Sequence, residues 1–222
     1  MFITLEGIEG SGKSTQIFHI FNFLTASGYP CVMTREPGGT QIGRKIRSIL
    51  LDPESTAMNP DAELLLYTAD RVQHIQEIIL PAITEEKIVV CDRYFDATLA
   101  YQGFARGLDI TSIQNLHRLI CRNLHPDLTF LLDVAPDLGL KRAWHQLKAG
   151  SRMDAESRFE NETIAFHERV RRGYLAIAEK EPERFRIVDA AQTESHVQAQ
   201  ILHILKSEIG RFVDQSAQDN AT

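Results

Sequence analysis

Residues 7–15 read Gly7-Ile8-Glu9-Gly10-Ser11-Gly12-Lys13-Ser14-Thr15, directly after a short apolar run and directly before a helical pattern. They match the phosphate-binding pattern G-x-x-x-x-G-K-[ST] in full. Glycines let such a loop curl so that successive N–H groups point inward at phosphate oxygens, and the positive end of the following helix adds to the attraction. Lys13 supplies a mobile charge for the β- and γ-phosphates, and the Ser14 hydroxyl suits Mg²⁺. We therefore expect Gly7 to Thr15 to bind the phosphates of a nucleoside triphosphate.

Outward from this loop, apolar runs and helical patterns alternate along the chain, which is typical of βαβ units and a parallel sheet. We expect strands at residues 2–6, 31–35, 87–92, 128–133 and 184–189. We expect helices at residues 13–27, 40–50, 61–79, 111–122, 136–149, 160–179 and 194–212. The predicted fold is α/β, with a five-stranded parallel sheet that carries helices on both faces in three α/β/α layers.

Length and composition set limits on the protein class. The 222 residues (25.1 kDa) suit one domain, predicted to span residues 1–213, with 214–222 as a frayed polar tail. A net charge of −6 argues against a nucleic-acid polymer as partner. The three cysteines are too few and too scattered for a disulfide framework or a zinc site. No apolar stretch is long enough for a membrane span, and Met1 leads straight into the first strand, so we expect a cytoplasmic protein.

Two polar clusters occur where predicted strands end, the edge at which open α/β sheets place their ligands. Thr34-Arg35-Glu36-Pro37-Gly38-Gly39 follows the second strand, and Asp92-Arg93-Tyr94 ends the third. Asp92 suits Mg²⁺ or a water bound to it, and Arg93 offers a planar fork for a phosphate. The phosphate loop alone indicates only the P-loop NTPase class, but the chain has no Asn-Lys-x-Asp guanine-reading motif, which argues against a Ras-like GTPase.

Taken together, four segments resemble the bacterial thymidylate kinase family in order and spacing: Gly7–Thr15, Thr34–Gly39, Asp92–Gly103 and Leu131–Arg142. The resemblance extends from about Met1 to Ala191. It implies a P-loop nucleoside-monophosphate kinase that transfers the γ-phosphate of ATP to dTMP with Mg²⁺, giving ADP and dTDP. It also implies a homodimer.

The same resemblance implies roles for residues that would surround the acceptor base. Arg71 matches the arginine that bonds the thymine carbonyl, and Tyr67 matches an aromatic ring that stacks on the base. Thr98 and Gln102 match polar positions near the base. By its own pattern, Tyr67 would instead be assigned to the core.

Further roles concern the acceptor sugar and phosphate. Glu9 matches an acidic residue that holds the sugar 3′-hydroxyl, and Tyr101 matches the tyrosine that crowds the sugar C2′. Arg35 and Arg93 are placed near the acceptor phosphate. Lys13, Asp92 and Arg93 are therefore expected to be catalytic, and Ser14 and Asp92 are the expected metal ligands.

The variable positions of the phosphate loop contain no arginine, so further positive charge must come from elsewhere. Residues 148–158 are polar, contain a glycine and carry basic residues at both ends, which resembles the family's short mobile lid. The resemblance implies that Arg158, and secondly Arg152, approach the ATP phosphates. A solvent-exposed helix face is the alternative for either arginine.

Two rival functions remain. One is a kinase for dUMP, UMP or a deoxynucleoside, against which Arg71 and Tyr101 argue. The other is a P-loop regulatory or binding protein that phosphorylates no small acceptor, in which the clusters at residues 34–39 and 92–94 would have no clear purpose.

Overall fold

A computed structural model describes residues 1–148 and 157–219, and within these ranges the chain has five strands. They are β1 (Phe2–Glu6), β2 (Cys31–Arg35), β3 (Ile88–Asp92), β4 (Leu128–Asp133) and β5 (Phe185–Asp189). All neighbours are parallel, in the order β2-β3-β1-β4-β5. The central strands are buried almost throughout, because a parallel sheet is covered on both faces. The predicted five-stranded parallel sheet is confirmed.

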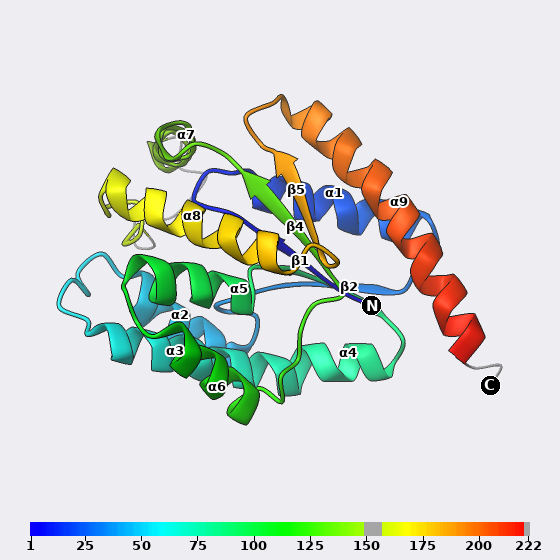
Figure 1. The fold of residues 1–222 in the computed structure, drawn as a ribbon, viewed down its shortest axis with the longest axis horizontal. Helices are drawn as coiled ribbons and strands as arrows, with labels where there is room; N and C mark the ends of the chain where they lie inside the picture. Colours follow the sequence, from blue (N-terminus) through cyan, green and yellow to red (C-terminus); the bar gives the residue numbers. More distant parts are fainter. Residues whose placement is uncertain (149–156, 220–222) are drawn as a thin grey trace.

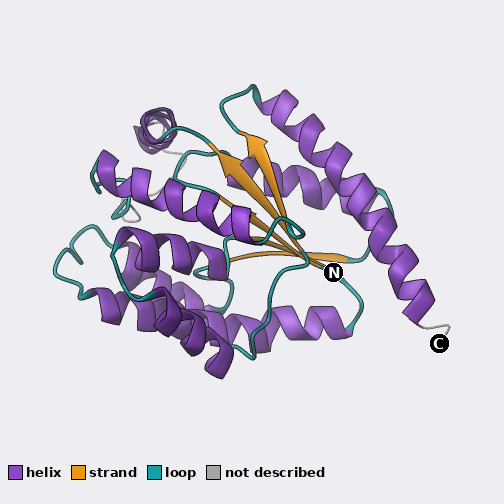
Figure 2. Ribbon diagram, viewed as in Figure 1, coloured by secondary structure: helices purple, strands orange, loops and turns teal. Residues whose placement is uncertain are grey.

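Helices cover both faces of this sheet (Figures 1 and 2). One face carries α1 (Lys13–Ala26) and α9 (Glu194–Asp219), and the other carries α4 (Leu80–Thr84), α5 (Phe95–Thr98) and α8 (Ile164–Lys180). Further out, α2 (Gln41–Leu51) packs against α3 (Pro60–His74), and α7 (Pro136–Lys148) packs against α8. No helix of the described residues combines the length and apolarity that crossing a membrane requires.

The helix predicted at residues 61–79 continues further than expected. Between α3 and α4 lies a π-helical turn, η1 (Ile75–Ile79), in which the Leu80 N–H bonds the Ile75 carbonyl. Pro81 has no N–H and its ring would clash with a carbonyl four residues earlier, so a wider turn lets the helix pass the proline.

A helical segment that the sequence patterns did not predict follows β3. It consists of α5 and a second π-helical stretch, η2 (Leu99–Ala105), against which α6 (Ile110–Ile120) packs. Residues 99–103 are all buried, so this segment lacks the alternation of polar and apolar faces from which a helix is usually recognised.

Helix ends differ from the prediction by more than two residues in two further places. α8 begins at Ile164 rather than at residue 160, because the Thr163 side chain caps it by accepting the Phe166 N–H. α9 continues to Asp219, through most of the stretch expected to fray. No Gly or Pro interrupts residues 211–219, and polar composition alone does not end a helix.

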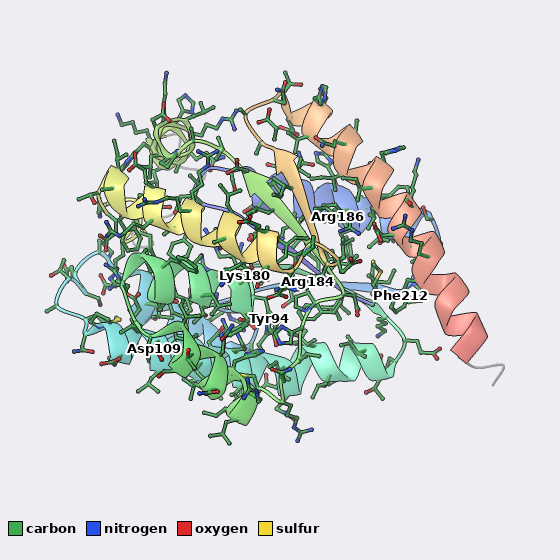
Figure 3. The ribbon with its side chains drawn as sticks, in the orientation of Figure 1. Tyr94, Asp109, Lys180, Arg184, Arg186 and Phe212 are labelled. Atoms are coloured by element: carbon green, nitrogen blue, oxygen red, sulfur yellow. The ribbon has the colours of Figure 1, made fainter. Side chains whose placement is uncertain are left out.

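Ion pairs fasten the edge strand β5 to helices on both sides of the sheet. Arg184, just before the strand, bonds Asp96 of α5 at 2.7 Å, and Arg186 bonds Glu208 of α9 at 2.9 Å (Figure 3). Both ion pairs therefore lie at an edge of the sheet, two strands away from β1 and the phosphate loop that follows it.

Candidate active site

A cavity of about 490 Å³ opens at the carboxyl ends of β1, β2 and β3. This is where the strand order reverses around β1, the usual place for a ligand in an open parallel sheet. Fourteen of the predicted site residues line it: Glu9, Gly10, Gly12, Lys13, Ser14, Thr15, Arg35, Tyr67, Arg71, Asp92, Arg93, Thr98, Tyr101 and Gln102. One cavity therefore contains both the phosphate loop and the predicted acceptor pocket.

The loop leaves β1 and turns directly into α1. Gly12 has φ +94°, a left-handed conformation that L side chains rarely adopt, and it precedes the first residue of the helix. Lys13 is 7% exposed, and its Nζ donates to the carbonyls of Gly7 (2.9 Å) and Ile8 (2.8 Å) and to Ser11 Oγ (3.2 Å). The three loop residues that do not line the cavity, Gly7, Ile8 and Ser11, thus accept the hydrogen bonds that hold the lysine in place.

The loop also needs glycine for a close approach to α7. A Cβ at Gly10 would lie 1.9 Å from the Gly139 carbonyl oxygen, and one at Gly139 would lie 2.6 Å from the Glu9 carbonyl oxygen. The two backbones therefore pack directly on each other, which fixes the loop against a helix as well as a strand.

The charge of Lys13 is sensitive to pH. Burial, aided by the nearby Arg93, lowers the pKa of Lys13 to about 8. Protonated lysine therefore predominates at neutral pH and is lost as the pH rises through that value.

We expect kcat/KM for ATP to fall by roughly tenfold per pH unit above about 8, because this parameter follows ionisations of the free enzyme. Lys13→Arg is the control, since a guanidinium stays charged over this range. The pH profile of kcat/KM for Lys13→Arg should be flatter than that of wild type, whatever the absolute rate of the variant. A wild-type profile without a decline between pH 7 and 9.5 would contradict the assignment.

Ser14 and Asp92 supply the oxygen atoms that a magnesium ion prefers. Ser14 Oγ donates to Asp92 Oδ2 at 3.3 Å, beside the phosphate loop. Magnesium binds through one or two protein oxygens and completes its shell with water and substrate phosphates. These residues fit that role. In the described part of the chain, no group of three or more His, Cys, Asp or Glu side chains could hold a metal ion with protein ligands alone.

Arg93 is held in a defined direction. Its backbone has φ +67°, which is uncommon for a side-chain-bearing residue, and its amide donates to the Leu5 carbonyl at 3.0 Å. The guanidinium donates to Glu9 Oε1 (2.9 Å) and Tyr174 Oη (3.0 Å) and lies 5.0 Å above the Tyr101 ring. These contacts fix a positive charge on the cavity wall, beside Glu9 of the phosphate loop.

Glu9 stands at the centre of this wall. Its Oε1 also accepts a hydrogen bond from Tyr101 Oη at 2.6 Å, and its Oε2 lies 3.1 Å from His167 Nδ1. Burial alone would raise the pKa of Glu9, but Arg93, His167 and Lys13 together hold it well below its ordinary value. Glu9 is therefore ionised at neutral pH and can accept a hydrogen bond from a ligand hydroxyl.

The other end of the cavity is built from α3 and η2. Arg71 is 2% exposed and donates to Thr98 Oγ1 at 2.7 Å. Adjacent residues Tyr101 and Gln102 both line the cavity, and Gln102 donates to Glu63 at 2.8 Å. The π-helical geometry of η2 gives this segment an unusual helical register, of a kind that occurs frequently at functional sites.

Arg158 is not among the cavity-lining residues. Its guanidinium pairs with Glu63 at 2.6 Å and donates to the Leu50 carbonyl at 3.1 Å. Arg152 and most of the segment expected to form the lid, residues 149–156, lie outside the described residues.

Several cavity-lining residues were not predicted from the sequence: Glu36, Pro37, Arg47, Leu51, Tyr94, Ala97, Gln146, Phe159 and Glu160. Glu36 belongs to the Thr34–Gly39 cluster and could have been named individually. Pro37 belongs to the same cluster, Tyr94 to the cluster at residues 92–94 and Ala97 to the segment Asp92–Gly103. The others carry no local signal, since a lone Arg or Gln on a helix is most often solvent-exposed.

Known proteins resemble this chain in sequence and in fold. Residues 5–201 match the family model described as thymidylate kinase. This chain belongs to the thymidylate kinase family. It is 52% identical over 206 residues to the thymidylate kinase of Desulfosudis oleivorans, with 93% of this chain and 96% of the relative aligned. It is also 52% identical over 210 residues to that of Desulforapulum autotrophicum, covering 95% and 92%.

A solved structure agrees with this assignment. The crystal structure of thymidylate kinase from Ehrlichia chaffeensis superposes with a TM-score of 0.73 at 33% identity, covering 92% of this chain and 98% of the other. The family resemblance and the fold class expected from the sequence are both confirmed.

Proposed function

We propose that this protein transfers the γ-phosphate of ATP to dTMP, giving ADP and dTDP. Membership of the thymidylate kinase family supports the reaction. The observation that carries it is the single cavity in which a phosphate loop faces a second pocket lined by Arg93, Arg71 and Tyr101. A donor and an acceptor can therefore meet without either leaving the cavity.

Phosphoryl transfer depends mainly on alignment and charge stabilisation. The acceptor oxygen belongs to a phosphate that is already anionic, so the mechanism needs no strong general base. What it needs is positive charge between two phosphates that repel each other. Lys13 supplies it on the donor side and Arg93 on the acceptor side, and Arg35 lines the same cavity as a further cation.

Glu9 and Tyr101 limit how the acceptor lies. The ionised Glu9 would accept a hydrogen bond from the sugar 3′-hydroxyl, and the buried Tyr101 ring would leave little room for a 2′-hydroxyl. Tyr67 would stack on the base, with Thr98 and Gln102 near its edge. When bound, Mg²⁺ would be held by Ser14 and Asp92 and would neutralise charge on the donor phosphates.

A coupled assay for ADP release tests the reaction. Purified protein with Mg·ATP should release ADP with dTMP as acceptor, and more slowly with dUMP, UMP or thymidine. Release that is fastest with another acceptor would favour the rival kinases. Tight ATP binding without any acceptor-dependent ADP would favour a regulatory protein and refute the proposal.

We further propose that Arg158 acts on the transferring phosphates, with Arg152 as a second candidate. Arg158→Ala should then lower kcat by roughly 10²-fold or more while changing the KM for dTMP little, since the contact would favour the transition state. Kinetics with both substrates varied measures this.

Glu63→Gln is the matched control, because it removes the carboxylate charge that Arg158 contacts in this structure. If Arg158 serves only that ion pair, both variants should lose stability, Glu63→Gln the more because Glu63 also pairs with Arg106 at 3.3 Å, and Arg158→Ala should not lose turnover. An unchanged kcat in Arg158→Ala would remove Arg158 from the catalytic residues.

A homodimer in the cytoplasm completes the proposal. Ile42 and Ile49 on α2 and Leu65 on α3 are each at least half exposed, and a second copy of the chain would cover such apolar side chains. Analytical ultracentrifugation should find twice the mass of one chain, and a species of 25.1 kDa alone would contradict the dimer.

A further inference from the structure

A buried row of polar side chains lies behind the base end of the cavity, running from β2 to α3. Thr34 Oγ1 lies 2.6 Å from His74 Nε2, and His74 Nδ1 lies 2.8 Å from Glu36 Oε1. Glu36 Oε2 then accepts a hydrogen bond from Arg71 Nε at 2.9 Å. The side chains of His74, Glu36 and Arg71 are 0%, 3% and 2% exposed, so solvent does not weaken these contacts.

This row determines how the Arg71 guanidinium lies. Nε is taken by Glu36, and Nη2 donates to Thr98 Oγ1 and to the Tyr94 carbonyl at 3.3 Å. Nη1 makes no hydrogen bond to a described residue, and Arg71 lines the cavity. Because a guanidinium is planar, fixing Nε and Nη2 also fixes the direction in which Nη1 is offered to a ligand.

His74 holds the far oxygen of Glu36. Among the described residues, its Nδ1 is the partner of Oε1, so without His74 the carboxylate could rotate away from Arg71. The ring itself has no freedom to turn. It is bonded at both nitrogens, and a Cβ at Gly39 would lie only 2.7 Å from its Cδ2.

We propose that His74 is a positioning residue for recognition of the acceptor base: it holds Glu36, which orients Arg71 so that Nη1 meets a carbonyl oxygen of a pyrimidine. The inference rests on the proposed function, because it takes a thymine-bearing acceptor as the ligand. It assigns to His74 an effect on the binding of the base and none on the binding of the sugar phosphate. The phosphates are held at the other end of the cavity by residues that His74 does not contact.

Two substitutions separate the two nitrogens of the ring. His74→Asn places an amide N–H near the position of Nδ1 and keeps a donor for Glu36. His74→Gln reaches the position of Nε2 and keeps the contact with Thr34, but leaves Glu36 Oε1 without its donor. Both variants carry a neutral amide, and they differ in the hydrogen bond that is lost. His74→Asn loses the contact with Thr34, and His74→Gln loses the contact with Glu36.

Isothermal titration calorimetry with dTMP, and with 2-deoxyribose 5-phosphate as a ligand without a base, gives the readout. His74→Gln should weaken dTMP binding about tenfold or more, the effect of losing one hydrogen bond to a charged group. His74→Asn should stay within about threefold of wild type on the same reasoning. The affinity for 2-deoxyribose 5-phosphate and the KM for ATP should not change in either variant.

Equal dTMP affinity in the two variants would overturn the inference. So would an equal loss for dTMP and for the sugar phosphate in His74→Gln, since that would indicate a general disturbance of the pocket. If His74→Gln does not fold, Glu36→Gln takes its place with the same expected base-specific loss, and unchanged dTMP affinity there overturns the inference equally.

The wild-type protein separates this inference from the proposed function. Wild type that produces no dTDP refutes the function. Wild type that produces dTDP, together with indistinguishable His74 variants, refutes only the role of His74.

Discussion

Lys13→Ala is expected to lower kcat by roughly 10³-fold, in keeping with the loss of a preorganised charge at a transferring phosphate. The lysine is buried in the loop that it serves, and its Nζ is already directed by three hydrogen bonds. Removing it takes away the positive charge that we propose for the donor phosphates. Single-turnover kinetics with Mg·ATP and dTMP measures the effect on chemistry directly.

Two further variants make this result specific. Lys13→Met retains most of the side-chain volume and should lose as much activity, which separates lost charge from a collapsed loop. Lys141→Ala removes an exposed lysine from α7 and should behave as wild type. Turnover of Lys13→Ala close to that of the native chain would contradict the assignment of the phosphate loop itself.

Arg93→Met should combine a loss of activity with a loss of stability. We propose that Arg93 acts on the acceptor phosphate, so kcat should fall roughly 10³-fold, as in related chemistry. Its removal also leaves the buried Glu9 carboxylate without its nearest cation, at a cost of about 3 kcal/mol in the free energy of unfolding. Steady-state kinetics and urea denaturation measure the two effects separately.

The double variant Glu9→Gln/Arg93→Met tests the cause of the instability. Gln has nearly the shape of Glu but no charge to leave unpaired, so the double variant should be more stable than Arg93→Met while remaining inactive. If the double variant were no more stable than the single one, the ion pair would not explain the loss.

Much of the fold follows from local patterns. The strands are short apolar runs bounded by turn residues, and the phosphate loop is a contiguous motif, so both could be located without knowledge of distant contacts. The order of the strands in the sheet, by contrast, cannot be predicted from local patterns. It depends on which apolar runs pair, which local patterns do not show, and no strand order was predicted from the sequence.

The parts that could not be predicted depend on residues far apart in sequence. Glu36 and His74 are 38 residues apart and yet share one hydrogen bond, and no pattern in either segment reveals it. The same holds for the pairing of Arg158 with Glu63, which no local pattern could predict because the two residues lie far apart in the sequence. Motifs thus predicted the residues that face the cavity better than the residues that hold them in place.

The fully buried stretch of η2, Leu99 to Gly103, also restricts which substitutions this protein can accept during evolution. Ordinary surface helices tolerate drift on the side that faces water, but Leu99 to Gly103 present no such side. A methyl group at Gly103 would lie 2.2 Å from Ile110 Cδ1, so the Ile110 side chain would have to shift to admit it. Substitutions within Leu99 to Gly103 must therefore preserve buried packing, and lineages that diverge elsewhere should change this stretch more slowly.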